Sequence, residues 1–194
     1  MDALSHVCHD PDVQRDASCL ITGVGPGTGT ALARRFAAGG YRVAMLARDE
    51  ERLKSLAADV LRRNFEVDTM ALLELARLAA PAMIEAGDGV ILASGNTSAH
   101  RGKANFAGFA PGKAAQRILA QSMARSLGPR GVHVAYVTID AVIDLPWTRQ
   151  MAPEAPDEYF IQPRNIAAEC WHVAHQARTA WSFDVEIRPF GETW

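Results

Sequence analysis

The stretch from residue 18 to residue 48 constrains the fold of this chain more than any other part of it. A short apolar run at 19–22 is typical of a buried parallel strand. A glycine-rich turn follows, then an amphipathic helical pattern at 31–38 and a second apolar run at 41–46. The stretch therefore predicts a strand, a tight turn, a helix and a second strand, in that order.

The glycines between the first strand and the helix point to an anion. Backbone N–H groups and a helix N-terminus can approach a diphosphate closely where the turn carries no side chains. The alternative is a glycine-rich turn that binds nothing. A Walker-type phosphate loop is excluded, because no Gly-Lys-Ser/Thr follows the glycines. The turn contains glycine at four alternating positions: Gly23, Gly25, Gly27 and Gly29.

The amino-acid composition and net charge limit the partners, the compartment and the metal sites that we expect for this protein. The formal net charge of −2 gives no reason to expect a nucleic acid or an anionic membrane as partner. Three widely spaced cysteines argue against a disulfide framework and for a reducing compartment, so we expect the cytoplasm. Residues 1–17 are polar without a clear period and are interpreted as an N-terminal tail. No metal site is expected, because no cluster of His and Cys has enough ligands.

The rest of the chain alternates helices and strands. Helical patterning over 49–86 predicts one long helix, or two with a break near 61–65. Strands are expected at 89–94, 131–139 and 183–187, and helices between them in the chain at 106–127 and 166–177. Such alternation is typical of an α/β fold with a doubly wound parallel sheet, here one domain over 18–194. The segment 140–163, rich in proline and acids, has the character of a substrate-covering loop.

Arg48 stands where an NAD-binding protein usually carries an acid near the ribose hydroxyls. A guanidinium at this place can pair with a 2′-phosphate. The residue therefore favours NADP as cofactor, with NAD as second choice. The alternative is a solvated arginine at a strand end.

By its motifs the chain resembles the short-chain dehydrogenase/reductase family. The turn Thr22-Gly23-x-x-x-Gly27-x-Gly29 is similar to that family's cofactor turn, and 61–189 resemble its second half in order and spacing. The resemblance implies an NAD(P)-dependent oxidoreductase acting on an alcohol or carbonyl of unknown identity. It also implies that the turn residues hold the cofactor: Gly23, Gly25, Gly27, Thr28 and Gly29.

The family's Asn-Ser-Tyr-Lys catalytic set is mostly replaced. Its Tyr-x-x-x-Lys spacing falls on Phe109 and Lys113, and phenylalanine has no proton to transfer. The serine position falls on Asn96, and the helix asparagine position on Asp68. Only the lysine is retained, and the resemblance implies that it holds the ribose. Tyr159 is the expected surrogate for the missing proton donor.

The sequence departs from the family's pattern in two further places, one after the expected strand at 131–139 and one before the expected strand at 89–94. The family's Pro-Gly is Asp140-Ala141 here, and the threonine that follows it is Leu145. The family's third and fourth strands have no counterpart between 60 and 61. A Rossmann-like sheet lacking these strands either closes directly or leaves unpaired backbone groups that make the chain marginally stable. For direct closure, we expect 18–22 to pair in parallel with 89–94.

Three functions are open at this point. The first is an oxidoreductase of this family with impaired catalysis. The second is a non-catalytic nucleotide-binding or interaction protein, and the third is an inert truncated product. For either of the first two, we expect a homodimer or homotetramer that assembles through the long helices.

Overall fold

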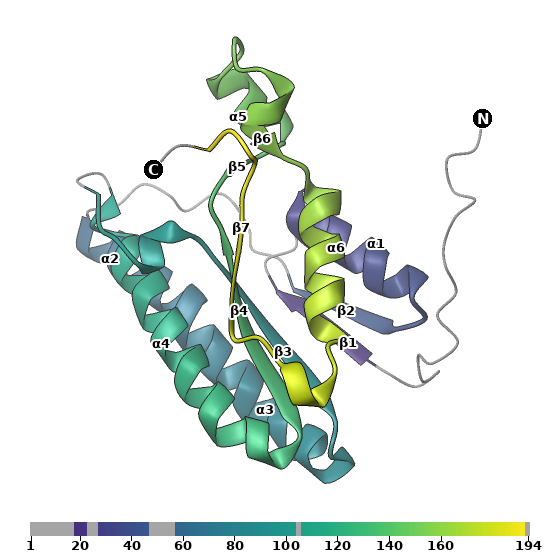
Figure 1. The fold of residues 1–194 in the computed structure, drawn as a ribbon. Helices are drawn as coiled ribbons and strands as arrows, with labels where there is room; N and C mark the ends of the chain where they lie inside the picture. The colour runs from purple at the N-terminus through teal and green to yellow at the C-terminus, as the bar shows by residue number, and fades with distance from the viewer. Residues whose placement is uncertain (1–17, 23–26, 47–56, 104–105, 193–194) are drawn as a thin grey trace. The chain divides into compact units, whose positions relative to one another are not determined.

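The computed structural model describes residues 18–22, 27–46, 57–103 and 106–192 (Figure 1). Contacts divide the chain into two compact units, which are described one at a time. The first is formed from Met1–Asp49 and Val142–Trp171, the second from Glu50–Ala141 and His172–Trp194. The single domain expected over 18–194 stays a prediction.

The first unit contains the strand–turn–helix–strand stretch. Strand β1 (Ser18–Thr22) pairs in parallel with β2 (Arg42–Leu46), and α1 (Thr28–Ala38) connects them, as predicted. The second part of this unit contributes four short or medium elements: β5 (Val142–Ile143), α5 (Pro146–Met151), β6 (Phe160–Ile161) and α6 (Pro163–Ala174).

Aromatic packing joins α1 to α6 within this unit. The ring of Trp171 lies 5.4 Å from that of Phe36 and 6.0 Å from that of Tyr41, centroid to centroid. A Cβ on Gly39 would overlap the Trp171 indole, so glycine is required there to let the two helices approach. Trp171 is therefore a packing residue.

The second unit is built on a parallel sheet of β3 (Gly89–Gly95), β4 (Val132–Ile139) and β7 (Asp184–Ile187). Strand β4 lies in the middle and is buried along its whole length. A central parallel strand is covered on both faces, which explains its nearly continuous apolar sequence. At the carboxyl ends Gly95 is aligned with Thr138, and Ile139 with Ile187.

Helices α3 (Ala71–Ala86) and α4 (Ala110–Leu127) pack against each other and on β3 and β4 (Figure 1). Helix α3 ends at Gly87, whose φ of 62° is the left-handed conformation that glycine adopts without strain. The core of the unit lies between these helices and the sheet, and consists of Leu72, Ala76, Ala93, Ala120, Met123, Val132, Val134 and Tyr136.

Helix α2 (Ala57–Phe65) continues into α3 through a π-helical turn, Glu66–Met70. Over the described part, 57–86, the predicted alternative of one long helix is therefore confirmed and the break near 61–65 is wrong, whereas 49–56 lie outside the described residues. The backbone stays helical, and its hydrogen bonds shift from i→i+4 to i→i+5 just beyond 65. No glycine or proline marks such a turn in the sequence.

The predicted pairing of 18–22 with 89–94 is also wrong. Among the described strands, β1 is hydrogen-bonded to β2, and β3 to β4.

The segment 140–163 is more ordered than a covering loop, since it holds α5, the paired strands β5 and β6, and a 3₁₀ turn at Asp157–Tyr159. Within the described ranges, no helix has both the length and the apolar character needed to cross a membrane.

Candidate functional site

The predicted site residues fall into both units, and each group is considered within its own unit. The turn residues Gly27, Thr28 and Gly29 belong to the first unit, as does Tyr159. Asn96, Phe109 and Lys113 belong to the second. The predictions for Gly23, Gly25 and Arg48 lie outside the described residues.

The described part of the glycine turn forms the start of α1. Gly27 is the residue before the helix, and its carbonyl accepts the N–H of Ala31 at 3.0 Å. Thr28 and Gly29 lie in the first helical turn. The Thr28 hydroxyl is buried and has no hydrogen-bond partner among the described residues. A buried hydroxyl at a helix N-terminus, where the backbone dipoles favour an anion, fits a phosphate oxygen.

The open side of Gly27 is not empty. A Cβ built on Gly27 would overlap the Leu145 side chain, with Cδ1 at 3.3 Å and Cγ at 3.4 Å. Gly27 thus has no room for a side chain, because Leu145 takes the adjacent space. The glycine and threonine residues of the turn are of types that suit a diphosphate, whereas the apolar side chain of the neighbouring leucine is not.

Lys113 lies in the first turns of α4 and is largely buried, its side chain 13% exposed. Its Nζ lies 3.0 Å from Oδ1 of Asp68, which is equally buried. It also donates to the Ser94 carbonyl at 3.3 Å and to Oε1 of Gln116 at 3.2 Å. An ammonium has three N–H donors, and three protein acceptors surround this one. The lysine as it stands offers no donor to a ribose.

The π-helical turn brings Asp68 to Lys113. The Asp68 carbonyl accepts a hydrogen bond from Nε2 of Gln116 at 3.0 Å. The hydroxyl of Thr69 donates to the Gly112 carbonyl, also at 3.0 Å. Both bonds fasten the turn to the first part of α4. The Asp68 carboxylate is therefore held at the lysine by backbone geometry as well as by charge.

Phe109 lies directly before α4, the helix that carries Lys113, and Asn96 directly follows β3. Neither side chain supplies the tyrosine or serine hydroxyl that the resemblance to the family implies. The Phe109 ring precedes α4, with its centroid 5.8 Å from Nζ of Lys113, a cation–π distance. Oδ1 of Asn96 accepts the N–H of Ser98 at 3.0 Å and caps the 3₁₀ turn Thr97–Ala99. The Asn96 oxygen is therefore used in a local backbone contact.

Tyr136 lies in β4 and was not among the predicted site residues. It is fully buried, and its hydroxyl donates to the Lys113 carbonyl at 3.5 Å. Burial, and then the charge of Asp68, raise its pKa well above the usual range. Its phenol fills the space that a side chain at Gly95 would occupy. An isolated glycine at the end of a strand is the signal for such a close approach.

Tyr159 has no established link to these groups. It closes the 3₁₀ turn of the first unit, is 42% exposed, and packs edge-on against Phe160 with centroids 5.0 Å apart. Its part as a surrogate proton donor stays a prediction. Among the described residues, no three His, Cys, Asp or Glu side chains are grouped so as to hold a metal ion.

Comparison with known proteins adds a family match and a fold. Residues 50–176 match the sequence model of a family described as enoyl-(acyl carrier protein) reductase. None of the curated proteins shows significant similarity to this chain.

Three solved structures illustrate the similarity in fold. A short-chain dehydrogenase from Rhodopseudomonas palustris is 24% identical, with a TM-score of 0.70 over 92% of this chain and 100% of its own. A metagenomic short-chain oxidoreductase in complex with NADP is 22% identical, with a TM-score of 0.68 over 89% and 97%. The TT0495 protein from Thermus thermophilus is 19% identical, with a TM-score of 0.72 over 89% and 97%. These likenesses confirm the predicted Rossmann-like α/β fold with a reduced number of strands.

Proposed function

This chain belongs to the short-chain dehydrogenase/reductase family, and we propose that within it the chain is a nicotinamide-dinucleotide-binding member with impaired oxidoreductase activity. The first half of the proposal rests on the glycine turn, where the unused Thr28 hydroxyl and the N-terminus of α1 suit a diphosphate. The second half rests on Lys113.

The single observation that carries the proposal is the saturation of Lys113 by Asp68, Ser94 and Gln116. A bound nicotinamide supplies or accepts hydride at a carbonyl or alcohol carbon. The substrate oxygen then needs a proton donor or a set of hydrogen-bond donors while charge develops on it. Phe109 has no such group, and Lys113 has no donor left to assist one. A carboxylate at Asp68 is unfavourable to a negative oxygen nearby.

NADP is the proposed cofactor, with NAD second. Arg48 supports this choice by residue type, because a guanidinium pairs with a 2′-phosphate in a bidentate geometry. One of the similar structures carries NADP, which agrees with the choice without deciding it for this chain.

A non-catalytic nucleotide-binding or interaction protein is the second candidate. The observation that favours it is again the buried Lys113–Asp68 pair, which turns a family site residue into part of the core. An inert truncated product is the third.

We also propose that the protein assembles with itself through its long helices. Large apolar side chains are exposed along α2, the π-helical turn, α3 and α4, where a partner helix would cover them. Leu78 and Ile118 are 68% and 55% exposed, and the others are Leu61, Phe65, Val67, Met70 and Leu73. Light scattering over a range of concentrations tests this: a monomer at every concentration contradicts it.

The test of the function is a titration of NADPH fluorescence with purified protein, followed by a panel of carbonyl substrates. We expect saturable binding followed by slow turnover. Ordinary turnover contradicts the impairment, binding without any turnover favours the second candidate, and the absence of both together with a broad melting transition favours the third.

A further inference from the structure

The Leu145 side chain lies against Gly27, the residue directly before α1. The Leu145 side chain lies where a Cβ of Gly27 would be, so that it contacts the backbone that a diphosphate has to approach. The family usually has threonine at this position, a smaller side chain with a hydroxyl. The leucine here places an apolar group against Gly27, the residue directly before α1.

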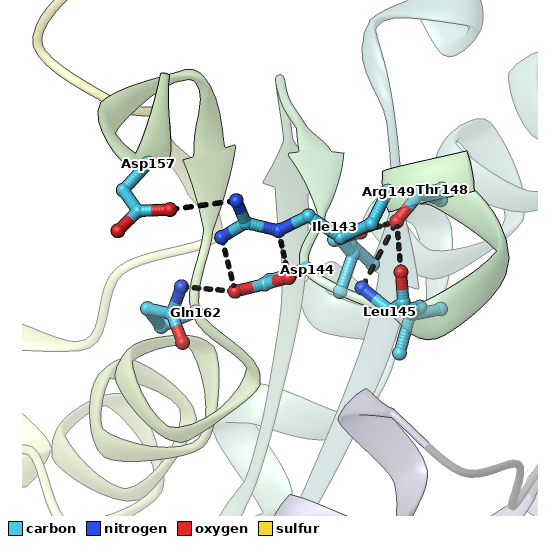
Figure 2. Close-up of polar contacts among 7 residues, drawn as sticks. All are labelled: Ile143, Asp144, Leu145, Thr148, Arg149, Asp157 and Gln162. Carbon is cyan, nitrogen blue, oxygen red and sulfur yellow. Dashed lines mark hydrogen bonds and ion pairs between the residues drawn. The ribbon is translucent and has the colours of Figure 1, made fainter. Parts of the chain in front are cut away.

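The backbone around Leu145 is held by Thr148, which is 5% exposed. Its hydroxyl accepts the N–H of Leu145 at 2.9 Å and donates to the Ile143 carbonyl at 2.6 Å, as Figure 2 shows. Ile143 is in turn part of β5, which pairs with β6. Leu145 thus lies between β5, which is held by its pairing with β6, and α5, whose Thr148 side chain bonds to the Leu145 backbone.

Arg149 completes this arrangement from α5 (Figure 2). Its guanidinium forms a bidentate pair with Asp144, Nε to Oδ1 at 2.7 Å and a terminal nitrogen to Oδ2 at 2.8 Å. The other terminal nitrogen donates to Asp157 at 2.6 Å, and the guanidinium lies 4.1 Å from the centre of the Phe160 ring. Gln162 donates to the same Asp144 carboxylate at 2.6 Å. The residue directly before Leu145 is therefore held by two side chains.

We propose that Leu145 sets the affinity of the Gly27 backbone and the N-terminus of α1 for a dinucleotide diphosphate, and that Arg149 is the positioning residue that keeps Leu145 there. The inference rests on the proposed function, since it concerns the same cofactor. A diphosphate that reaches the Gly27 backbone takes the space of the Leu145 isobutyl group. To make room for the diphosphate, the Leu145 side chain has to move away from Gly27, and this movement disturbs the contacts of Thr148 and Arg149. The free energy that the movement costs weakens binding of the cofactor.

The contact itself is tested without any ligand. Gly27→Ala is measured in the parent and in the Leu145→Ala background, so that any backbone cost of the alanine is the same in both. In the parent the added methyl group overlaps Leu145, and we expect Tm to fall by about 2–8 °C more than in the Leu145→Ala background. Equal losses in the two backgrounds overturn the placement of Leu145 on the turn.

The effect on affinity is tested by NADPH fluorescence titration. Leu145→Ala is expected to bind about tenfold more tightly, the gain when a competent state populated at about 10% becomes the only one. Arg149→Lys keeps the charge and loses the bidentate pair. It is expected to bind more tightly and to be cleaved faster by protease between residues 142 and 162. Met151→Ala, whose side chain is 76% exposed on the same helix, is the matched truncation and is expected to keep the parent's affinity.

The outcomes separate this inference from the proposed function. Binding by the parent with an unchanged Kd in Leu145→Ala overturns the inference and leaves the function standing. No binding by the parent or by any variant overturns both. Tighter binding by Leu145→Ala and Arg149→Lys, with Met151→Ala unchanged, supports both.

Discussion

Nζ of Lys113 lies 3.0 Å from the carboxylate of Asp68, and each side chain is 13% exposed. By resemblance to the family, the lysine is expected to be the retained member of a catalytic set, and the aspartate to stand at the position of another member. Their pairing converts two site positions into a buried ion pair. Removing one partner of such a pair leaves a charge with little water to solvate it.

The first prediction concerns this pair. Asp68→Ala is expected to lower the free energy of unfolding by about 3–5 kcal/mol, because Lys113 then keeps only two neutral acceptors. Lys113→Met combined with Asp68→Ala is expected to cost less than the sum of the single changes, with a coupling of about 0.5–3 kcal/mol. Urea unfolding of the four proteins measures both values. Strict additivity contradicts a direct pair.

The second prediction concerns acid. Hydrogen bonds from Arg149, and then from Gln162, lower the pKa of Asp144 from 3.8 to about 2. A carboxyl whose pKa is lower in the folded state stabilises the fold above its unfolded pKa, and this contribution is lost as the pH falls through the folded value. Stability should therefore decline from about pH 5 to pH 2. Arg149→Met should decline less steeply over the same interval in thermal melts, and parallel curves for the two proteins contradict the assignment.

The third prediction concerns repair of the site. Phe109→Tyr alone should raise carbonyl reduction little, because the new phenol meets a Lys113 whose donors are occupied. Phe109→Tyr with Asn96→Ser should do better, and the addition of Asp68→Asn better still, since members of such a set act together. Steady-state rates of NADPH oxidation rank the variants. A full recovery by Phe109→Tyr alone contradicts the role given to Asp68.

The fourth prediction concerns cofactor choice. Arg48→Asp should shift preference from NADP towards NAD, because a carboxylate repels a 2′-phosphate and accepts from ribose hydroxyls. Titration of the parent and the variant with both reduced cofactors gives the two ratios of Kd. Equal affinities in the parent already defeat the prediction.

The parts of the fold that sequence patterns predicted well are those with strong local periods. Strand β4 and helix α4 have boundaries close to those expected, because a continuous apolar run and a helical stripe determine them locally. The π-helical turn at Glu66–Met70 carries no local mark, since its residues are ordinary helix residues. The predicted pairing of 18–22 with 89–94 was wrong because it depended on the edges of two strands that lie far apart in the chain. No local pattern determines whether two such edges pair.

The candidate site likewise has parts that local sequence patterns predicted and parts that they did not. Lys113 lies on the predicted helix, and Phe109 is the residue directly before that helix, close to where their spacing put them. The contacts Lys113–Asp68 and Gly27–Leu145 join residues far apart in the chain, and they became visible only with the tertiary structure. Sequence reasoning therefore assigned Lys113 to the ribose, whereas the structure gives its ammonium three acceptors within the protein.

The most direct test of the central claim is a single-turnover measurement. Enzyme in excess is loaded with NADPH, mixed with a ketone that the family reduces, and followed by the loss of nicotinamide absorbance. The account predicts saturable binding followed by oxidation far slower than the ordinary range of about 1–10³ s⁻¹. Oxidation within that range by the unmodified protein would contradict it, because Lys113, Asp68 and Phe109 as arranged leave the substrate oxygen without a proton donor.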